Sequence, residues 1–142
     1  MKIEDLRIGN IVGINGSSIT NEMCVSEILT ISNVGNYFCD LKYNRPSKFL
    51  IGGYTGCFVN DLIPIPLTEK ILLKCGFSNL TEVHKRYFKH KDIDGCLFSG
   101  PEYSFYEYNN SIIDITYLHE LQNLHYSLTK KKLPIDINKL EL

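Results

Sequence analysis

Residues 116–129 constrain the fold most, because their apolar side chains recur with the period of an α-helix. At 100° per residue, positions four, seven and eleven apart return to one narrow arc. That arc consists of Tyr117, Leu121, Leu124 and Leu128. The pattern predicts an amphipathic helix over 117–129 that packs on a core through this arc. We expect His125 to pack at the edge of the arc, and His119 to lie on the opposite side, at solvent or a partner surface.

Nearly everything before this helix is typical of short β-strands separated by turn residues. The predicted strands are 11–14, 22–32, 37–43, 48–51 and 57–63. A change of alternation predicts a bulge near residues 26–27, and glycines predict a loop at 52–56. Five short strands with tight turns predict a small SH3-like β-barrel or bent sheet over residues 1–63.

The segment 64–66, Pro-Ile-Pro, is the predicted boundary, because two prolines make it stiff and extended. Behind it we expect an α+β unit over 64–142, packed against the first unit. Its predicted elements are a helix at 68–75, hairpins over 82–115 and the helix at 117–129. The tail from residue 133 is expected to add an edge strand or to fray.

The predicted helix at 68–75 carries signals at both ends. Thr68 suits the N-cap, and Gly76 suits the position after the last turn. Leu73 points away from the face formed by Ile71 and Leu72. A helix that is apolar on both sides is expected to lie between the two halves of the protein.

Composition restricts the class of protein. Of 142 residues, 44% are hydrophobic and 22% charged, as in ordinary globular proteins, and the net charge of −1 gives no overall attraction for nucleic acid. The first ten residues include Glu4 and Asp5 and lack an apolar run, which predicts no signal peptide. No apolar run reaches the roughly 18 residues that span a bilayer, so no membrane partner is expected.

The five cysteines predict a reducing compartment. They are odd in number, widely spaced and without a C-x-x-C pair, which favours free core thiols in a cytoplasmic protein. They are Cys24, Cys39, Cys57, Cys75 and Cys96.

Three blocks resemble a family of small proteins encoded by Bacteroidetes and their phages or prophages. The blocks are LRIGNIV at 6–12, PIPLTEKILLKCGF at 64–77 and YLHELQNLHYSLT at 117–129. The last block has Glu120 where the family pattern usually shows Gln, and His125-Tyr126-Ser127 where it shows Tyr-Phe-Ala. The resemblance implies a phage-linked origin and a location in the host cytoplasm, and it implies no activity.

No motif in the sequence predicts catalysis or a metal. There is no nucleophile elbow, and His119 and His125 are six positions apart, too far for a helical chelating pair. The spacing of nine, six and six among four further candidate ligands fits no zinc motif. Those candidates are Cys75, His84, His90 and Cys96. Asp92-Ile93-Asp94-Gly95 starts like a calcium loop but lacks the later ligands, which favours a turn. We therefore expect a protein that is not an enzyme and has no cofactor.

Basic and aromatic residues around a glycine loop form the candidate ligand site. A phosphate could bind the cations and backbone N–H groups, and a base could stack on the tyrosine. The residues are Lys42, Arg45, Lys48, Gly53 and Tyr54. The competing interpretation is a solvated hairpin connection that needs glycine only for its turns. A second basic stretch, 84–91, is expected to be an edge strand protected by charge.

The leading hypothesis is a non-enzymatic, phage-associated binding or assembly protein that acts through protein–protein contacts. Its partner would be a phage or host protein, or further copies of itself as a homo-oligomer. The alternative is a nucleotide or nucleic-acid binding module that uses the 42–54 loop, including one that sequesters a signalling nucleotide during immune evasion.

Overall fold

The computed structural model describes residues 2–14, 27–35, 38–43, 54–80, 86–108, 110–136 and 140. The chain divides into two compact units, Met1–Ile65 and Pro66–Leu140. Each unit contains a five-stranded antiparallel sheet, and the second also contains two α-helices. The α+β class expected from the sequence is therefore confirmed.

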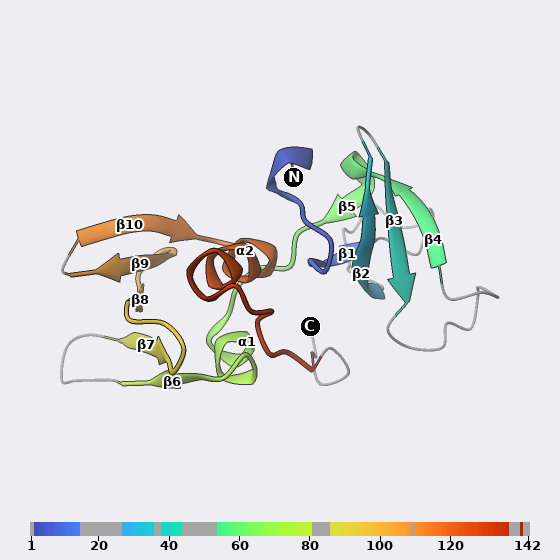
Figure 1. Cartoon of the computed structure of the whole chain (residues 1–142). Coiled ribbons are helices and arrows are strands. Elements are labelled where there is room, and N and C mark those ends of the chain that lie inside the picture. The colour runs from blue at the N-terminus through green and yellow to red at the C-terminus, as the bar shows by residue number, and fades with distance from the viewer. Residues whose placement is uncertain are drawn as a thin grey trace. The chain divides into compact units, whose positions relative to one another are not determined.

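The first unit is a meander whose last strand returns to its first (Figure 1). Its order is β4-β3-β2-β1-β5, and β5 pairs antiparallel with β1. The described strands pair no further, so the sheet stays open between β4 and β5. The elements are η1 (Ile3–Asp5), β1 (Ile11–Ile14), β2 (Glu27–Val34), β3 (Phe38–Tyr43), β4 (Tyr54–Phe58), η2 (Val59–Asp61) and β5 (Leu62–Ile63).

A tight turn before β1 connects the LRIGN block to the core. The Asn10 side chain accepts a hydrogen bond from the Arg7 amide at 2.7 Å, and Gly9 takes a φ of 95°, which glycine tolerates without steric cost. The Gly9 amide then donates to the Ile31 carbonyl at 2.8 Å. The turn thereby aligns β1 beside β2. The core cluster of this unit is Leu6, Val12, Ile31, Val59 and Leu62.

Two predictions for this unit are wrong. The single strand over 57–63 is instead the end of β4, one 3₁₀ turn and β5; Val59 and Leu62 are buried three positions apart, which is the period of that turn rather than of a strand. Residues 54–56 belong to β4 and not to a loop. The register of β2 shifts between Ile31 and Asn33, whereas Glu27 pairs regularly with Ile14. The predicted strand 48–51 and residues 22–26 lie outside the described residues.

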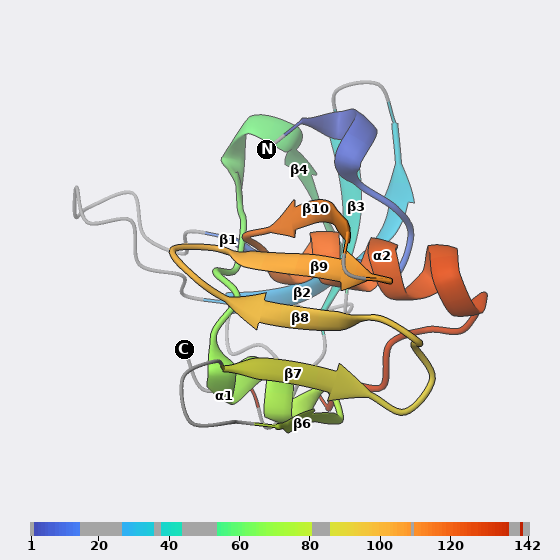
Figure 2. The ribbon, with the colours of Figure 1, turned by 90° about the vertical axis from the view of Figure 1, so that its left-hand side faces the viewer.

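The second unit is a two-layer structure (Figures 1 and 2). Its sheet is an antiparallel meander in the order β10-β9-β8-β7-β6, and both helices lie on one face of it. The elements are α1 (Glu69–Lys74), β6 (Phe77–Asn79), β7 (Tyr87–His90), β8 (Cys96–Ser99), β9 (Tyr103–Glu107), β10 (Asn110–Ile115) and α2 (Leu118–Thr129). Its buried apolar side chains include Ile71, Leu72, Phe77, Phe88, Leu97, Phe105, Ile115, Leu118 and Leu121.

Short-range hydrogen bonds set the helix ends. The Thr68 hydroxyl accepts from the Ile71 amide at 3.3 Å, and Gly76 follows α1 with a φ of 86°, so both predicted signals are confirmed. The Glu120 carboxylate accepts from the amides of Thr116 and Tyr117 at 2.8 and 3.0 Å, which satisfies N–H groups left free at the start of α2.

Two of the three sequence blocks meet inside this unit. The Leu67 amide donates to the Thr116 carbonyl at 2.8 Å, and Pro66 forms an isolated bridge with Tyr117. The segments that lead into α1 and α2 are therefore paired with each other. Pro66 and Leu67 belong to the PIPLT stretch and Tyr117 begins the YLHEL stretch, so both stretches take part in this pairing.

The buried face of α2 differs from the predicted one. Leu118, His119, Leu121 and His125 are buried, whereas Leu128 is 45% exposed. The buried arc of Leu118, Leu121 and His125 is rotated toward the edge at which the sequence analysis placed His125, and Leu121 belongs to both arcs. The expectation that His119 lies at the surface is wrong: its ring is 2% exposed and stacks on Tyr117 with centroids 5.8 Å apart.

Leu73 is 48% exposed, on the side of α1 opposite to its buried residues Ile71 and Leu72. The expectation that this helix lies between the two halves of the protein stays a prediction. Residues 77–79 form strand β6, which the sequence reading omitted because three residues are too few for an alternation pattern. Residues 133–136 of the tail form no strand, and Leu133 and Leu140 are buried, while the rest of the tail lies outside the described residues.

Candidate functional site

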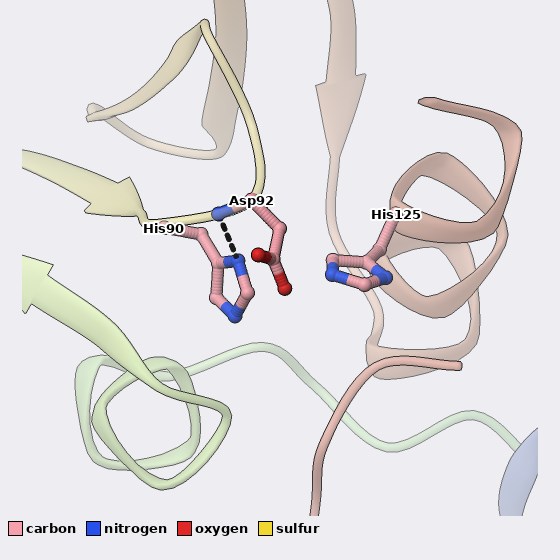
Figure 3. Close-up of side chains that lie close together, drawn as sticks. All are labelled: His90, Asp92 and His125. Carbon is pink, nitrogen blue, oxygen red and sulfur yellow. Dashed lines mark hydrogen bonds between the residues drawn. The ribbon is translucent and has the colours of Figure 1, made fainter. Parts of the chain in front are cut away.

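A pair of buried histidines lies between the sheet and α2 of the second unit (Figure 3). His90 is the last residue of β7, and His125 lies on the buried face of α2. Both rings are 0% exposed, and their centroids are 4.9 Å apart with the ring planes at 89°. Histidine side chains are seldom fully buried, and buried ring nitrogens normally have hydrogen-bond partners, so the partners of these two rings need to be identified.

Asp92 completes the cluster from the turn that follows β7. Asp92 is exposed, and in Figure 3 its carboxylate lies close to both imidazole rings. One ligand atom from each of the three residues lies within 4.8 Å of the others. The cluster therefore has two buried members and one that reaches solvent.

The hydrogen bonds of His125 fix its protonation pattern. Nδ1 lies 3.0 Å from the Lys131 carbonyl oxygen, which can only accept, so Nδ1 carries the proton and donates. The Nε2 atom then has a lone pair, and it is buried with no hydrogen-bond partner among the described residues. A left-handed C-cap at Lys130, with φ 58°, turns the chain so that the Lys131 carbonyl reaches the ring.

The hydrogen bonds of His90 give the opposite pattern. Its Nδ1 accepts from the backbone amide of Asp92 at 3.1 Å, so the neutral ring carries its proton on Nε2 (Figure 3). Within the described chain, His90 Nε2 is buried and makes no hydrogen bond of good geometry. The Cys75 backbone lies close to the His90 ring and raises the pKa of His90, as the smallest of the effects on that pKa. Both imidazoles therefore have one nitrogen satisfied and one not.

The environment keeps His90 neutral. Burial lowers the pKa of His90 below its ordinary value of 6.5, the neighbouring His125 lowers it further, and the Asp92 carboxylate opposes both effects. The ring is packed by Phe77, whose centroid is 5.0 Å away, and a Cβ on Gly76 would lie 3.4 Å from Nε2. A neutral imidazole held this firmly is suited to electron-pair donation.

A metal ion bound at this cluster would replace one hydrogen bond of His90. It would take the His90 Nδ1 lone pair in place of the Asp92 amide. That amide bond is a neutral hydrogen bond worth about 0.5–1.5 kcal/mol net. The binding free energy of zinc at structural sites is about 10–16 kcal/mol, so the loss of this one hydrogen bond does not by itself prevent metal binding.

The residues predicted to bind a ligand are only partly described. Lys42 in β3 is the register partner of Tyr54 in β4, so the two ends of the intervening segment are brought together. Arg45, Lys48 and Gly53 lie outside the described residues. The 42–54 site therefore stays a prediction.

Two of the cysteines, Cys75 and Cys96, are free thiols. Cys75 is buried, and burial raises its pKa to about 12, while half-buried Cys96 has a raised pKa for the same reason. Cys39 and Cys57 are register partners in the β3–β4 ladder, and Cys24 lies outside the described residues. At neutral pH, Cys75 is consequently a core side chain and a poor nucleophile.

A second candidate surface lies on the β9–β10 hairpin, and we call it the β10 patch. It consists of Tyr108, Ile112 and Ile113, which are 86%, 57% and 49% exposed. Among the described strands, β10 pairs only with β9 and lies at an edge of the sheet, and its register shifts between Ser111 and Ile113. Three large exposed apolar side chains within six residues are an unusual concentration for a protein surface.

Sequence reasoning missed the histidine cluster for a geometric reason. His90 and Asp92 are two positions apart at the end of a strand, but His125 joins them only through the packing of α2 on the sheet. The one available signal was a His-x-Asp pair beside a predicted strand end, together with a histidine on the helix. That signal becomes specific only when His125 is assigned to the buried face.

No protein-family model, curated protein or solved structure matches this chain. In the part of the chain that the structure describes, the helices are too short and too polar to cross a membrane.

Proposed function

We propose that this protein is a non-enzymatic binding or assembly protein that contacts a protein partner through the β10 patch. The observation that carries the proposal is the group of exposed apolar side chains at β10, the edge strand of the described sheet. Figure 1 shows the hairpin of β9 and β10 extending away from α2. The partner is a phage or host protein, or another copy of this chain in a homo-oligomer, within the host cytoplasm.

The backbone of the β10 patch supports a role beyond packing. Tyr108 has a φ of 49°, a left-handed conformation that is strained for a bulky residue. Such strain costs about 1–3 kcal/mol and is concentrated at functional sites. An aromatic side chain that is both strained and 86% exposed contributes little to folding, which favours a contact with a partner.

The mode of contact follows from the irregularity in β10. The register shift at Ile112 interrupts the ladder, and bulges of this kind protect sheet edges against the addition of another strand. The partner is therefore expected to dock on side chains rather than to extend the sheet. Ile112 and Ile113 would supply most of the buried area.

We also infer that the first unit is a small SH3-like barrel. Its support is the return of β5 to β1 after a single 3₁₀ turn, which places the first and last strands of the meander beside each other. A curled sheet of this type would present its connecting loops for binding.

Replacing Ile112 and Ile113 together by Lys should abolish partner capture. Burial of one isoleucine contributes about 1.5–3 kcal/mol, and 1.4 kcal/mol is a factor of ten, so affinity should fall at least about a hundredfold. The measurement is affinity capture from host or phage-infected lysate, with the bound species compared between variants. Sedimentation of the purified chain tests the homo-oligomer.

The matched control is Leu128→Lys, because Leu128 is exposed to a similar extent on α2 of the same unit. It should retain every species that the wild type captures. Equal capture by the double variant, or a strictly monomeric protein that captures nothing, would contradict the proposal.

A second candidate function is nucleotide or nucleic-acid binding at the 42–54 loop. The observation that favours it is the register of β3 and β4, in which the positions of Lys42 and Tyr54 are partners on neighbouring strands. Thermal-shift measurements against mononucleotides, cyclic dinucleotides and DNA should show stabilisation that Arg45→Ala and Lys48→Ala remove. If no ligand shifts the melting temperature, or if both variants shift like the wild type, this candidate is eliminated.

A further inference from the structure

We propose that His90, Asp92 and His125 form a binding site for one divalent first-row transition-metal ion. Two imidazole nitrogens and one carboxylate oxygen are a donor set that proteins use for zinc and for non-haem iron. The three residues leave further coordination positions for water or a ligand. This site is separate from the β10 patch and does not depend on it.

The first argument is an excess of electron-pair donors. One ring nitrogen of each histidine and one carboxylate oxygen of Asp92 lie within 4.8 Å of one another. The His125 Nε2 lone pair has no partner among the described residues, and the His90 Nδ1 lone pair accepts from the Asp92 amide. The Asp92 amide is the one N–H group that the described residues direct at these atoms. A metal cation is the species that accepts several lone pairs at once, so it would satisfy the cluster.

The second argument is the orientation of His125. Metal-binding histidines commonly donate the other ring N–H to a backbone carbonyl, which fixes the tautomer and the ring. His125 makes this interaction through Nδ1 with Lys131, and its Nε2 is left buried and without a partner among the described residues. The ring is therefore prepared to donate from Nε2.

The geometry requires a small closure around the ion. Zinc bonds of about 2.0–2.1 Å place tetrahedral ligand atoms about 3.3 Å apart, whereas the three atoms here lie within 4.8 Å of one another. The two histidines are packed, but Asp92 is an exposed turn residue, so its carboxylate is the group that moves. The same exposure gives the ion a path from solvent.

The competing explanation is a buried water or an extra proton shared by the rings. A water molecule with two to four polar partners could satisfy both unpaired nitrogens without any metal. The two explanations differ in their response to a transition-metal ion. Hard cations such as Mg²⁺ prefer all-oxygen sites, so they should not substitute.

Calorimetric titration of the EDTA-treated full chain with ZnCl₂ tests the proposal. We expect one Zn²⁺ per chain, an increased melting temperature, and no binding of Mg²⁺. The ring ¹⁵N shifts of His90 and His125 should change on zinc addition. Absence of zinc binding by the wild-type chain would overturn the proposal.

Asp92→Asn is the decisive variant, because it removes a ligand at an exposed position and keeps the amide that His90 accepts from. Loss of an outer-shell partner already costs about 10–100-fold in metal affinity, so loss of this ligand should cost at least about tenfold. Asp94→Asn, two residues further along the same turn, is the matched control and should bind zinc within about twofold of wild type.

His125→Gln provides a second test, with circular dichroism to report folding, because the substitution is at a buried position. A folded His125→Gln variant should bind zinc at least about tenfold more weakly, as judged from the loss of an entire ligand. Zinc binding that Asp92→Asn leaves unchanged would place the ion elsewhere on the chain and refute the assignment.

Discussion

Gly95→Ala is expected to destabilise the second unit by about 3 kcal/mol, near the upper end of overpacking costs. Gly95 lies buried in the connection between β7 and β8. A Cβ built there would overlap the Phe105 ring and lie 2.5 Å from the Tyr106 carbonyl oxygen. Both obstacles belong to β9, a central strand whose backbone cannot shift without disturbing the pairing with its neighbours.

Urea denaturation measures this effect as a lower midpoint with an unchanged slope. Gly100→Ala is the matched control, since its Cβ would meet only the Glu102 carbonyl at 3.4 Å. That variant should stay within about 1 kcal/mol of wild type, partly offset by the lower entropy of its unfolded chain. Equal stability of the two variants would show that β9 does not pass over Gly95 as described.

Phe88→Ala should destabilise the protein by about 3–5 kcal/mol, a large part of the 5–15 kcal/mol that typical domains possess. Phe88 is 1% exposed in the centre of β7, pairs in register with buried Leu97, and meets the Tyr103 ring edge-on with centroids 5.9 Å apart. Truncation would leave a cavity that neighbouring strands are too firmly paired to fill.

Thermal unfolding followed by circular dichroism provides the measurement. For a unit of this size each kcal/mol corresponds to about 4–8 °C in melting temperature, so the loss should be obvious. Leu128→Ala serves as the control, because Leu128 is 45% exposed and should lose less than about 1 kcal/mol. A Phe88→Ala protein that melts with the control would contradict the assigned core.

Neither substitution tests function, but both test the scaffold on which the candidate sites depend. Phe88 lies two positions before His90 on β7, and Gly95 lies in the connection that contains Asp92. A scaffold that fails these tests could not hold two buried imidazole rings with centroids 4.9 Å apart. The stability variants therefore also bear on the proposed metal site.

Local signals identified much of the fold. Thr68 and Gly76 marked the ends of α1 because capping depends only on neighbouring backbone groups. Turn residues predicted the strand at 11–14, which is β1, and the hairpins over 82–115, which include β9 and β10, for a similar reason. The 3₁₀ turn at Val59–Asp61 and the short strand β6 escaped prediction, because three residues carry too little periodicity to identify.

A candidate site could be seen in the sequence only where its residues are close together in the chain. The 42–54 loop was visible in the sequence because its basic and aromatic residues are contiguous, and it remains untested. The histidine cluster was invisible because its members come from the end of one strand, the following turn and a helix more than thirty residues away. The β10 patch depends on which sheet edge stays uncovered, and no local pattern reports that.

The sequence by itself predicted the two α-helices, most of the strands and the capped ends of α1, because each depends on residues close together in the chain. Tertiary structure alone decided which stripe of α2 is buried. The apolar residues of that helix cover more than one narrow arc, and packing on the sheet buries the arc of Leu118, Leu121 and His125. That choice is what brings His125 beside His90 and Asp92.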